Sequence, residues 1–253
     1  MKTEYRICAL IPVYNHGATT PAVVAELEKQ NLDTILVDDG SRKETRIILE
    51  ELIRTNPHCV LVQLNENSGK GGAVIAGLKR AKERGFSHVL QVDADGQHGL
   101  GTIRGFLSDS IAHYGALIAG APVYDESAPR SRMVGRKITN FWVSLETLSG
   151  NITDAMCGYR IYPVDITLSA LRALYIDKRM GFDIEVLVRL HWMGVPLRFR
   201  PVTVDYPENG ISNFRMVRDN FAISLVHTKL FFGMILRLPF LFIRRLFQGR
   251  SNG

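Results

Sequence analysis

The first half of the chain alternates regularly between short apolar segments and segments of helical character. The apolar segments are rich in β-branched residues and span Ile7–Val13, Thr34–Val37, Cys59–Leu64 and His88–Val92. The helical segments between them span Thr20–Gln30, Lys43–Thr55 and Gly72–Arg84, with Gly85 as the C-terminal cap of the last one. This alternation predicts an α/β fold with a mostly parallel central sheet, helices on both faces, and ligands outside the carboxyl ends of the strands.

The second half of the chain has a more mixed pattern. We expect strands over Ala116–Val123 and Pro196–Val204, helices over Ile138–Leu148 and Asp183–Met193, a basic loop over Pro129–Lys137 and a polar loop over Thr153–Tyr162. No internal repeat or low-complexity linker divides the sequence. We therefore predict one domain over residues 1–220, with two parts of different pattern (1–125 and 126–220), followed by a tail over 221–253.

The sharpest chemical signal is a pair of aspartates, Asp93 and Asp95, directly after a predicted buried strand. Carboxylates two residues apart at a strand end can converge on one hard cation, and Gln97 offers a third oxygen. Ionised carboxylates at such a place are costly without a counter-ion. The pattern favours a Mg²⁺ or Mn²⁺ site over a simple turn, for which Asp and Gly are also suited.

Two further polar clusters follow predicted strands. Asp38 and Asp39 end the second strand, where a carboxylate can accept a hydrogen bond from a ring N–H of a nucleotide base. The alternative is a turn in which Ser41 caps the next helix, and both can hold together. Lys70 lies in the glycine-rich segment Asn67–Gly72 before a helix, which suits a phosphate group, although the spacing is not that of a P-loop.

Charge is distributed unevenly along the chain. The formal net charge is +6, but residues 1–125 carry −2 and residues 126–253 carry +8. A basic half predicts an anionic partner, such as a phosphate, a lipid headgroup or a nucleic acid. The basic residues are not interleaved with aromatic side chains on a strand platform, which disfavours nucleic acid as the partner.

The segment Phe221–Phe247 is rich in Phe, Leu and Ile but is interrupted by charged residues and by Pro239. A membrane-spanning helix needs about 20 apolar residues with few charges, so we expect two short amphipathic helices that lie in a membrane interface. The seven basic residues and one acidic residue between Arg215 and Arg250 suit anionic headgroups. The alternative is a helix packed on the domain or in a dimer interface, and the sequence leaves open whether the chain forms a homo-oligomer.

The order of these clusters resembles that of the family-2 inverting glycosyltransferases of the GT-A type. It runs from Pro12-Val13-Tyr14-Asn15 through Asp38–Ser41, Asn67–Gly72 and Asp93–His98 to Asp154–Arg160, Gly181–Glu185 and Gly210–Phe214. The chain is most similar to the dolichol-phosphate mannosyltransferase group and its bacterial polyprenyl-phosphate relatives. The resemblance implies a metal-dependent enzyme that moves a sugar from a UDP or GDP sugar to a polyprenyl phosphate, or a similar lipid carrier, at the cytoplasmic face of a membrane.

The resemblance makes residues 1–125 the donor nucleotide half and residues 126–220 the acceptor half, and it implies roles for individual residues. It places the nucleotide-sugar against Pro12, Tyr14, Asn15, Asp38, Asp39, Lys70 and Asp93, the metal on Asp93, Asp95 and Gln97, and the acceptor phosphate against Arg130, Arg132, Arg136, Arg160 and Ser212. Two positions depart from the family pattern. His16 stands where many members have Glu, and Pro207–Asn213 lacks the Arg and Lys that the mannosyltransferase group often shows.

The identity of the acceptor decides whether a catalytic base is needed. A lipid phosphate is already ionised at neutral pH, whereas a hydroxyl of a glycan or lipid must lose its proton to a carboxylate. Glu185 is then the first candidate for the base and Asp154 the second. Asp95 is the predicted catalytic residue at the metal. The structural alternative for Glu185 is an ion pair with Arg189, four residues further along a helix. An alternative from another class is a catalytically idle, membrane-associated adaptor that keeps the nucleotide-binding fold.

Overall fold

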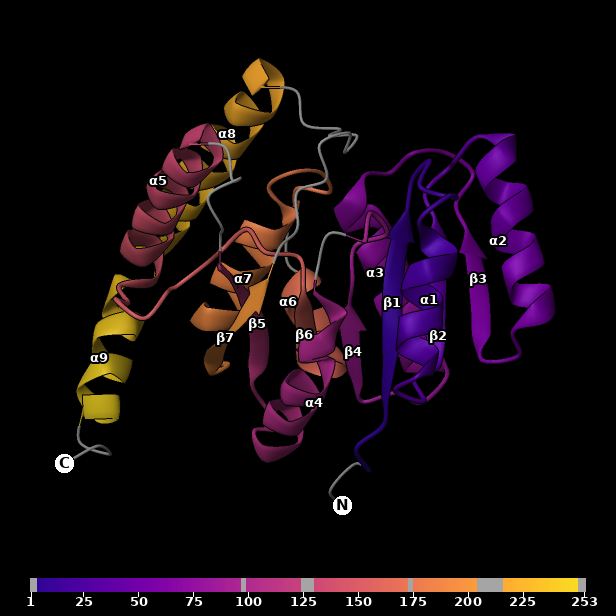
Figure 1. The fold of residues 1–253 in the computed structure, drawn as a ribbon. Coiled ribbons are helices and arrows are strands. Elements are labelled where there is room, and N and C mark those ends of the chain that lie inside the picture. The colour runs from indigo at the N-terminus through magenta and orange to yellow at the C-terminus, as the bar shows by residue number, and fades with distance from the viewer. Residues whose placement is uncertain (1–3, 97–98, 124–129, 173–174, 204–215, 250–253) are drawn as a thin grey trace.

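A computed structural model describes residues 4–96, 99–123, 130–172, 175–203 and 216–249. In these residues a mixed sheet of seven strands has the order β3-β2-β1-β4-β6-β5-β7 (Figure 1). The strands are β1 (Ile7–Val13), β2 (Thr34–Asp38), β3 (Cys59–Gln63), β4 (His88–Gln91), β5 (Leu117–Val123), β6 (Arg160–Pro163) and β7 (Leu197–Thr203). All neighbouring strands are parallel except β6, which runs antiparallel to both β4 and β5. The predicted mostly parallel sheet is confirmed.

Helices cover both faces of the sheet, as predicted. They are α1 (Thr20–Glu28), α2 (Lys43–Thr55), α3 (Lys70–Glu83), α4 (Ile103–Ala112), α5 (Arg130–Thr147), α6 (Val164–Leu171), α7 (Phe182–Trp192), α8 (Met216–Ile235) and α9 (Leu238–Gly249), with a short 3₁₀ helix, η1 (Leu100–Thr102), before α4. Alternation along β1 divides the core, because successive side chains point to opposite faces. Leu10 packs with residues of α3, α6 and α7, whereas Ile11 packs with residues of α1, α2 and α4.

Local signals explain where several helices begin and end. Helix α2 has Glu44 in its first turn and Arg54 in its last turn, so both charges complement the helix dipole. Helix α3 is followed by Gly85 at φ +75°, the left-handed conformation expected at the C-terminal end of a helix. The predicted cap by Ser41 is wrong: Arg42 precedes α2 and no side chain caps it. The Ser41 hydroxyl instead accepts a hydrogen bond from the backbone N–H of Asn15 at 3.0 Å.

Three features of the second half differ from the sequence-based expectation. Helix α5 begins at Arg130, so most of the segment expected as a basic loop is helical. Strand β6 lies at the end of the segment expected as a polar loop, and α4 and α6 were not predicted. The β6 sequence, Arg-Ile-Tyr-Pro, is too short and too polar to show a strand pattern, and it becomes a strand because β4 and β5 pair with it on both sides.

The C-terminal helices do not form a separate unit. Helix α8 lies against α5 on the side of the molecule away from α2 (Figure 1), and it begins before the boundary predicted at residue 220. Its inner side chains Val226, Leu230 and Met234 are buried in the same core as α3 and α7. The break between α8 and α9 lies beside Pro239, as expected. The alternative of a tail packed on the domain is therefore present in the structure.

The outer side of the same helices is apolar and exposed. Large hydrophobic side chains there are Val134, Ile138, Phe141, Trp142 and Leu145 on α5, Phe221, Leu225, Phe232 and Ile235 on α8, and Leu236, Phe240, Phe242 and Ile243 at or on α9. We call these side chains the outer apolar surface. Within the described part of the chain, no helix has the length and hydrophobicity needed to cross a bilayer.

Candidate active site

The strongest cluster of charged side chains joins three elements of the fold. Asp93 follows β4, Lys70 is the first residue of α3, and Asp183 is the second residue of α7. The Lys70 ammonium lies 2.9 Å from Asp93 Oδ1 and 3.1 Å from Asp183 Oδ2. Burial alone would lower the pKa of Lys70, but the carboxylates of Asp183 and Asp93 outweigh it and raise the pKa, so this ammonium stays charged.

Asp183 was not among the predicted site residues. It lies 7% exposed in a helix whose other side chains are mostly apolar and buried. A carboxylate in the first turn of such a helix is a signal in itself, because ionised Asp is rarely buried without a partner. Its partner, Lys70, is distant in the sequence, so the pairing could not be predicted from local pattern.

The carboxylates after β4 have the chemistry expected for a divalent cation. Asp93 already holds an ammonium, and one oxygen of Asp183 is buried without a hydrogen-bond partner in the described residues. Asp95 is part-exposed and Gln97 lies outside the described residues. Among the residues that the structure describes, no three His, Cys, Asp or Glu side chains form a metal-holding group. Two carboxylates with an adjacent amide suit Mg²⁺ or Mn²⁺, which commonly keep water and substrate phosphate as their other ligands.

Asp38 and Asp39 both build the loops at the end of β2. Asp38 Oδ1 accepts the backbone N–H of Ser41 at 2.8 Å, and Arg46 Nε lies 3.3 Å from its other oxygen. Asp39 accepts the backbone N–H groups of Ser68 at 2.7 Å and Gly69 at 2.9 Å. Burial raises the pKa of Asp39, and these two N–H donors oppose the shift. Asp39 therefore positions the loop that leads into α3 and Lys70.

The residues after β1 lie beside the same loops. Asn15 has φ +60°, and its side-chain oxygen accepts the backbone N–H of Arg42 at 2.9 Å, which ties the β1 and β2 ends together. Tyr14 is exposed and Pro12 is part-buried within β1, where it pairs with Val37 of β2. The structure thus brings Pro12, Tyr14 and Asn15 to the strand edge that carries Asp38 and Asp39.

Asp154 and Arg136 form an ion pair between α5 and the loop before β6. Arg136 donates to Asp154 Oδ2 at 2.5 Å, and Asp154 Oδ1 accepts the backbone N–H groups of Met156 and Cys157. Of the other predicted acceptor residues, Ser212 lies outside the described residues, and the side chains of Arg130 and Arg132 are not described. The structure therefore places Arg136 beside Asp154.

Arg160 and Glu185 are engaged inside the fold. The Arg160 guanidinium is fully buried and donates to the backbone carbonyls of Cys157, Asp183 and Ala155 at 2.6, 2.6 and 2.8 Å. These carbonyl contacts fix the loop, whereas the predicted phosphate contact requires a guanidinium that faces an open pocket. Glu185 is also fully buried and pairs with Arg189 and Lys229, both at 2.5–2.6 Å. The ion pair with Arg189 expected as the structural alternative is therefore present.

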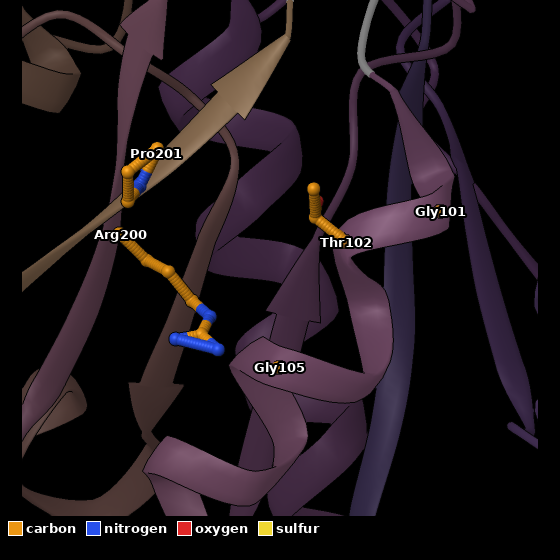
Figure 2. Close-up of a pocket in the computed structure, with 5 residues that line it drawn as sticks. All are labelled: Gly101, Thr102, Gly105, Arg200 and Pro201. Atoms are coloured by element: carbon orange, nitrogen blue, oxygen red, sulfur yellow. The ribbon is translucent and has the colours of Figure 1, made fainter.

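A hollow of about 410 Å³ lies apart from these residues, between α4 and β7 (Figure 2). Gly101, Thr102, Gly105, Arg200 and Pro201 line it. Arg200 reaches toward α4, where it pairs with Asp109 at 3.1 Å. None of the predicted site residues lines this hollow.

Comparison with known proteins identifies the family. Residues 8–167 match the model of glycosyl transferase family 2. A UDP-N-acetylglucosamine–dolichyl-phosphate N-acetylglucosaminyltransferase of Methanococcus voltae is 30% identical over 66% of this chain and 72% of its own length. An undecaprenyl-phosphate mannosyltransferase of Micrococcus luteus is 28% identical over 82% of this chain and 86% of its own length.

Solved structures share the fold at low sequence identity. The mannosyltransferase PcManGT of Pyrobaculum calidifontis, solved with GDP-Man and Mn²⁺, has a TM-score of 0.57 at 15% identity and covers 99% of this chain and 77% of its own. TarS of S. aureus, solved with UDP, has a TM-score of 0.58 at 16% identity over 89% of this chain and 65% of its own. With the family match and the mostly parallel sheet, these comparisons show that the chain belongs to glycosyl transferase family 2 and is a glycosyltransferase of the GT-A fold.

Proposed function

We propose that this glycosyltransferase moves a sugar, with inversion at the anomeric carbon, from a UDP or GDP sugar to a polyprenyl phosphate or a similar lipid carrier. The observation that carries the proposal is the acceptor named for the relatives. Dolichyl phosphate and undecaprenyl phosphate appear in the names of two proteins that align over 66% and 82% of this chain. A long-chain prenyl phosphate is the chemistry common to both.

The donor binds at the ends of β1, β2 and β4 in this proposal. Asp38 or Asp39 reads the base, with Pro12, Tyr14 and Asn15 at the same edge of the sheet. Lys70 and Asp93 lie at the diphosphate, where the ammonium offsets the negative charge that develops on the leaving group. Asp93, Asp95 and Gln97 would hold Mg²⁺ or Mn²⁺, which supplies further positive charge to that diphosphate. The catalytic role of Asp95 in this proposal is to hold that metal ion at the diphosphate.

The acceptor binds near Arg136 and Asp154 in this proposal, with Arg130, Arg132 and Ser212 as further contacts. An ionised phosphate oxygen can attack the anomeric carbon directly, so no side chain needs to remove a proton. The partners of Glu185 support this choice: two cations and the backbone N–H of Asp177 occupy its oxygens. A hydroxyl acceptor would instead require a free carboxylate, and the oxygens of Asp154, the second candidate, are likewise engaged by Arg136, Met156 and Cys157.

The outer apolar surface supports a peripheral position at the cytoplasmic face of a membrane. Exposed Phe, Leu and Ile side chains of α5, α8 and α9 gather on one side of the molecule, where their burial in lipid is favourable. Exposed basic residues, such as Lys137 on α5 and Arg237 between α8 and α9, suit anionic headgroups. A lipid-linked acceptor would then reach the site without leaving the bilayer.

The test is a transfer assay with purified protein, Mn²⁺, a panel of UDP and GDP sugars, and polyprenyl phosphate in detergent. We expect one donor to give a lipid-linked sugar phosphate whose anomeric configuration, measured by NMR, is opposite to that of the donor. EDTA and the Asp95→Asn variant should abolish the product. Equal transfer to dephosphorylated polyprenol would contradict the phosphate acceptor, and the absence of transfer from every donor would favour an adaptor.

A further inference from the structure

Lys70 faces two carboxylates that play different parts in the proposed site. Its ammonium lies 2.9 and 3.2 Å from the two oxygens of Asp93 and 3.1 Å from Asp183 Oδ2. Gly158 closes the other side, because a Cβ at this position would collide with the ammonium of Lys70. The ammonium is thus confined to a small space between the end of β4 and the start of α7.

The Lys70 ammonium is paired with the Asp93 carboxylate, which is also the group that would bind a divalent cation. A cation bound to Asp93 would share the two carboxylate oxygens that Lys70 now contacts, and two positive charges at such short range repel each other. Binding of the ion is therefore favoured when Lys70 moves away from Asp93. The free energy of that exchange becomes part of the apparent affinity for the ion.

Asp183 is built to receive the displaced ammonium. Its Oδ2 already lies within ion-pair distance of Lys70, and its Oδ1 is buried without a hydrogen-bond partner in the described residues. A buried carboxylate oxygen without a partner is costly. A small movement of Lys70 toward α7 would satisfy this oxygen while it withdraws the ammonium from Asp93.

We propose that Lys70 and Asp183 form a charge-exchange pair that sets the affinity of Asp93 for the divalent cation. Lys70 neutralises Asp93 in the metal-free enzyme and passes to Asp183 when the ion binds. Both are positioning residues for the ion, whatever contacts Lys70 then makes to the donor. This inference rests on the proposed function, since it takes Asp93 as a metal ligand.

The experiment measures Mn²⁺ binding by electron paramagnetic resonance of the free ion, without any sugar donor. Lys70→Met removes the competing charge, so we expect Mn²⁺ to bind about tenfold more tightly than to the wild type. Asp183→Asn leaves Lys70 with Asp93 alone, so binding should weaken about tenfold. In the Lys70→Met background, Asp183→Asn should have little effect, because no ammonium remains to be transferred.

Matched controls come from an ion pair elsewhere on the surface. Lys82 and Asp165 pair at 2.9 Å and are both exposed, so Lys82→Met and Asp165→Asn make the same charge changes away from the site. Both should leave Mn²⁺ binding unchanged. Lys70→Met leaves the carboxylates of Asp93 and Asp183 without their shared ammonium, which could impair folding. A crystal structure of the wild type soaked in Mn²⁺ therefore provides a second measurement. Lys70 should then contact Asp183 and no longer Asp93.

Several outcomes would overturn the inference. Weaker or unchanged Mn²⁺ binding in Lys70→Met contradicts the competition, as does a soaked crystal in which Lys70 still contacts Asp93. An equal effect of Asp183→Asn with and without Lys70 means that Asp183 acts on the ion directly. Two other outcomes would contradict the metal site of the proposed function itself. One is that neither the wild type nor Lys70→Met binds Mn²⁺, and the other is that Asp93→Asn binds it as tightly as the wild type.

Discussion

His227 on α8 and Glu146 on α5 form a buried pair in which Nδ1 and Oε1 lie 2.8 Å apart. The second polar atom of each side chain, Nε2 of His227 and Oε2 of Glu146, is buried without a hydrogen-bond partner in the described residues. The ring of Trp142 lies 6.3 Å from that of His227, and the indole N–H of Trp192 donates to the backbone carbonyl of Glu146. The pair is a specific polar contact in an otherwise apolar helix interface.

The first prediction concerns the stability of this interface. His227→Ala should lower the free energy of unfolding by about 2–4 kcal/mol, because it leaves Glu146 buried without its partner. Urea unfolding followed by circular dichroism measures the change. The double variant Glu146→Met with His227→Leu should recover most of the loss, since both polar groups are then gone. A single-variant loss below about 0.5 kcal/mol would mean that the pair is not a determinant of helix docking.

The second prediction concerns pH. Burial raises the pKa of Glu146, and the hydrogen bond from His227 only partly opposes this shift. A raised pKa means that the folded state holds the proton more tightly, so the contribution of Glu146 is greatest below the unfolded pKa and is lost as pH rises through the folded value. The wild type should therefore lose stability relative to Glu146→Gln as the pH rises through that window, in urea titrations at a series of pH values. Parallel pH profiles for the two proteins would refute this.

The third prediction concerns the space around Lys70. A Cβ on Gly158 would collide with the Lys70 ammonium and lie 2.9 Å from Asp93 Oδ2. Gly158→Ala should therefore displace both side chains and lower kcat/KM for sugar transfer by about a hundredfold. Gly150→Ala is the matched control, because a Cβ there meets open space, and it should retain activity. Equal activity of the two variants would show that the space around the Lys70 ammonium tolerates a methyl group.

The fourth prediction separates a structural from a catalytic role of Glu185. Glu185→Gln should lower the free energy of unfolding by about 2–3 kcal/mol, because Arg189 and Lys229 lose their common carboxylate. Turnover per folded molecule should stay within about twofold of the wild type if the acceptor is a phosphate. Glu51→Gln, which breaks an exposed pair with Arg54, should leave the melting temperature unchanged. A large loss of turnover in a stably folded Glu185→Gln enzyme would restore the role of general base.

The fifth prediction concerns the membrane. Leu236 and Phe232 are 82% and 59% exposed on the outer apolar surface, so Leu236→Glu with Phe232→Glu should reduce flotation with anionic vesicles by about tenfold or more. The melting temperature should not change, because neither side chain is in the core. Ile111→Glu alters a side chain that is 61% exposed on α4 and serves as the control. Deletion of the tail would be a poor test, since α8 supplies Val226, Leu230 and Met234 to the core.

The sequence was most informative where chemistry and local pattern coincide. The apolar runs and turn residues predicted β1, β2 and β3 almost residue by residue, and the bounds of α2 were those expected. The ends of β2 and β4 carry Asp38 and Asp93, so the edge that holds the candidate site was also predictable. Each of these strands can be recognised from its own short segment. Parallel pairing then brings the carboxyl ends of the strands, and the polar residues that follow them, to one edge of the sheet.

Contacts between distant segments could not be predicted in this way. Asp183 pairs with Lys70, and Glu185 pairs with Lys229 besides the expected Arg189; both lysines lie far away in the sequence and on other helices. The burial of Arg160 depends on three carbonyl groups that only the folded loop brings together. Arg160 and Glu185, which the sequence offers for contact with substrate, are therefore bound to other groups within the fold. These partners can be identified only from the tertiary structure.

The antiparallel strand β6 also imposes an order of assembly on the growing polypeptide. Strands β1 to β4 pair only with one another and with β6, so the hydrogen bonds among these four strands need no residue after Gln91. Strand β5 precedes β6 in the chain but reaches β4 only through it, because β6 lies between them. The strand β5 can therefore join the sheet of β1 to β4 only after Arg160–Pro163 has been made.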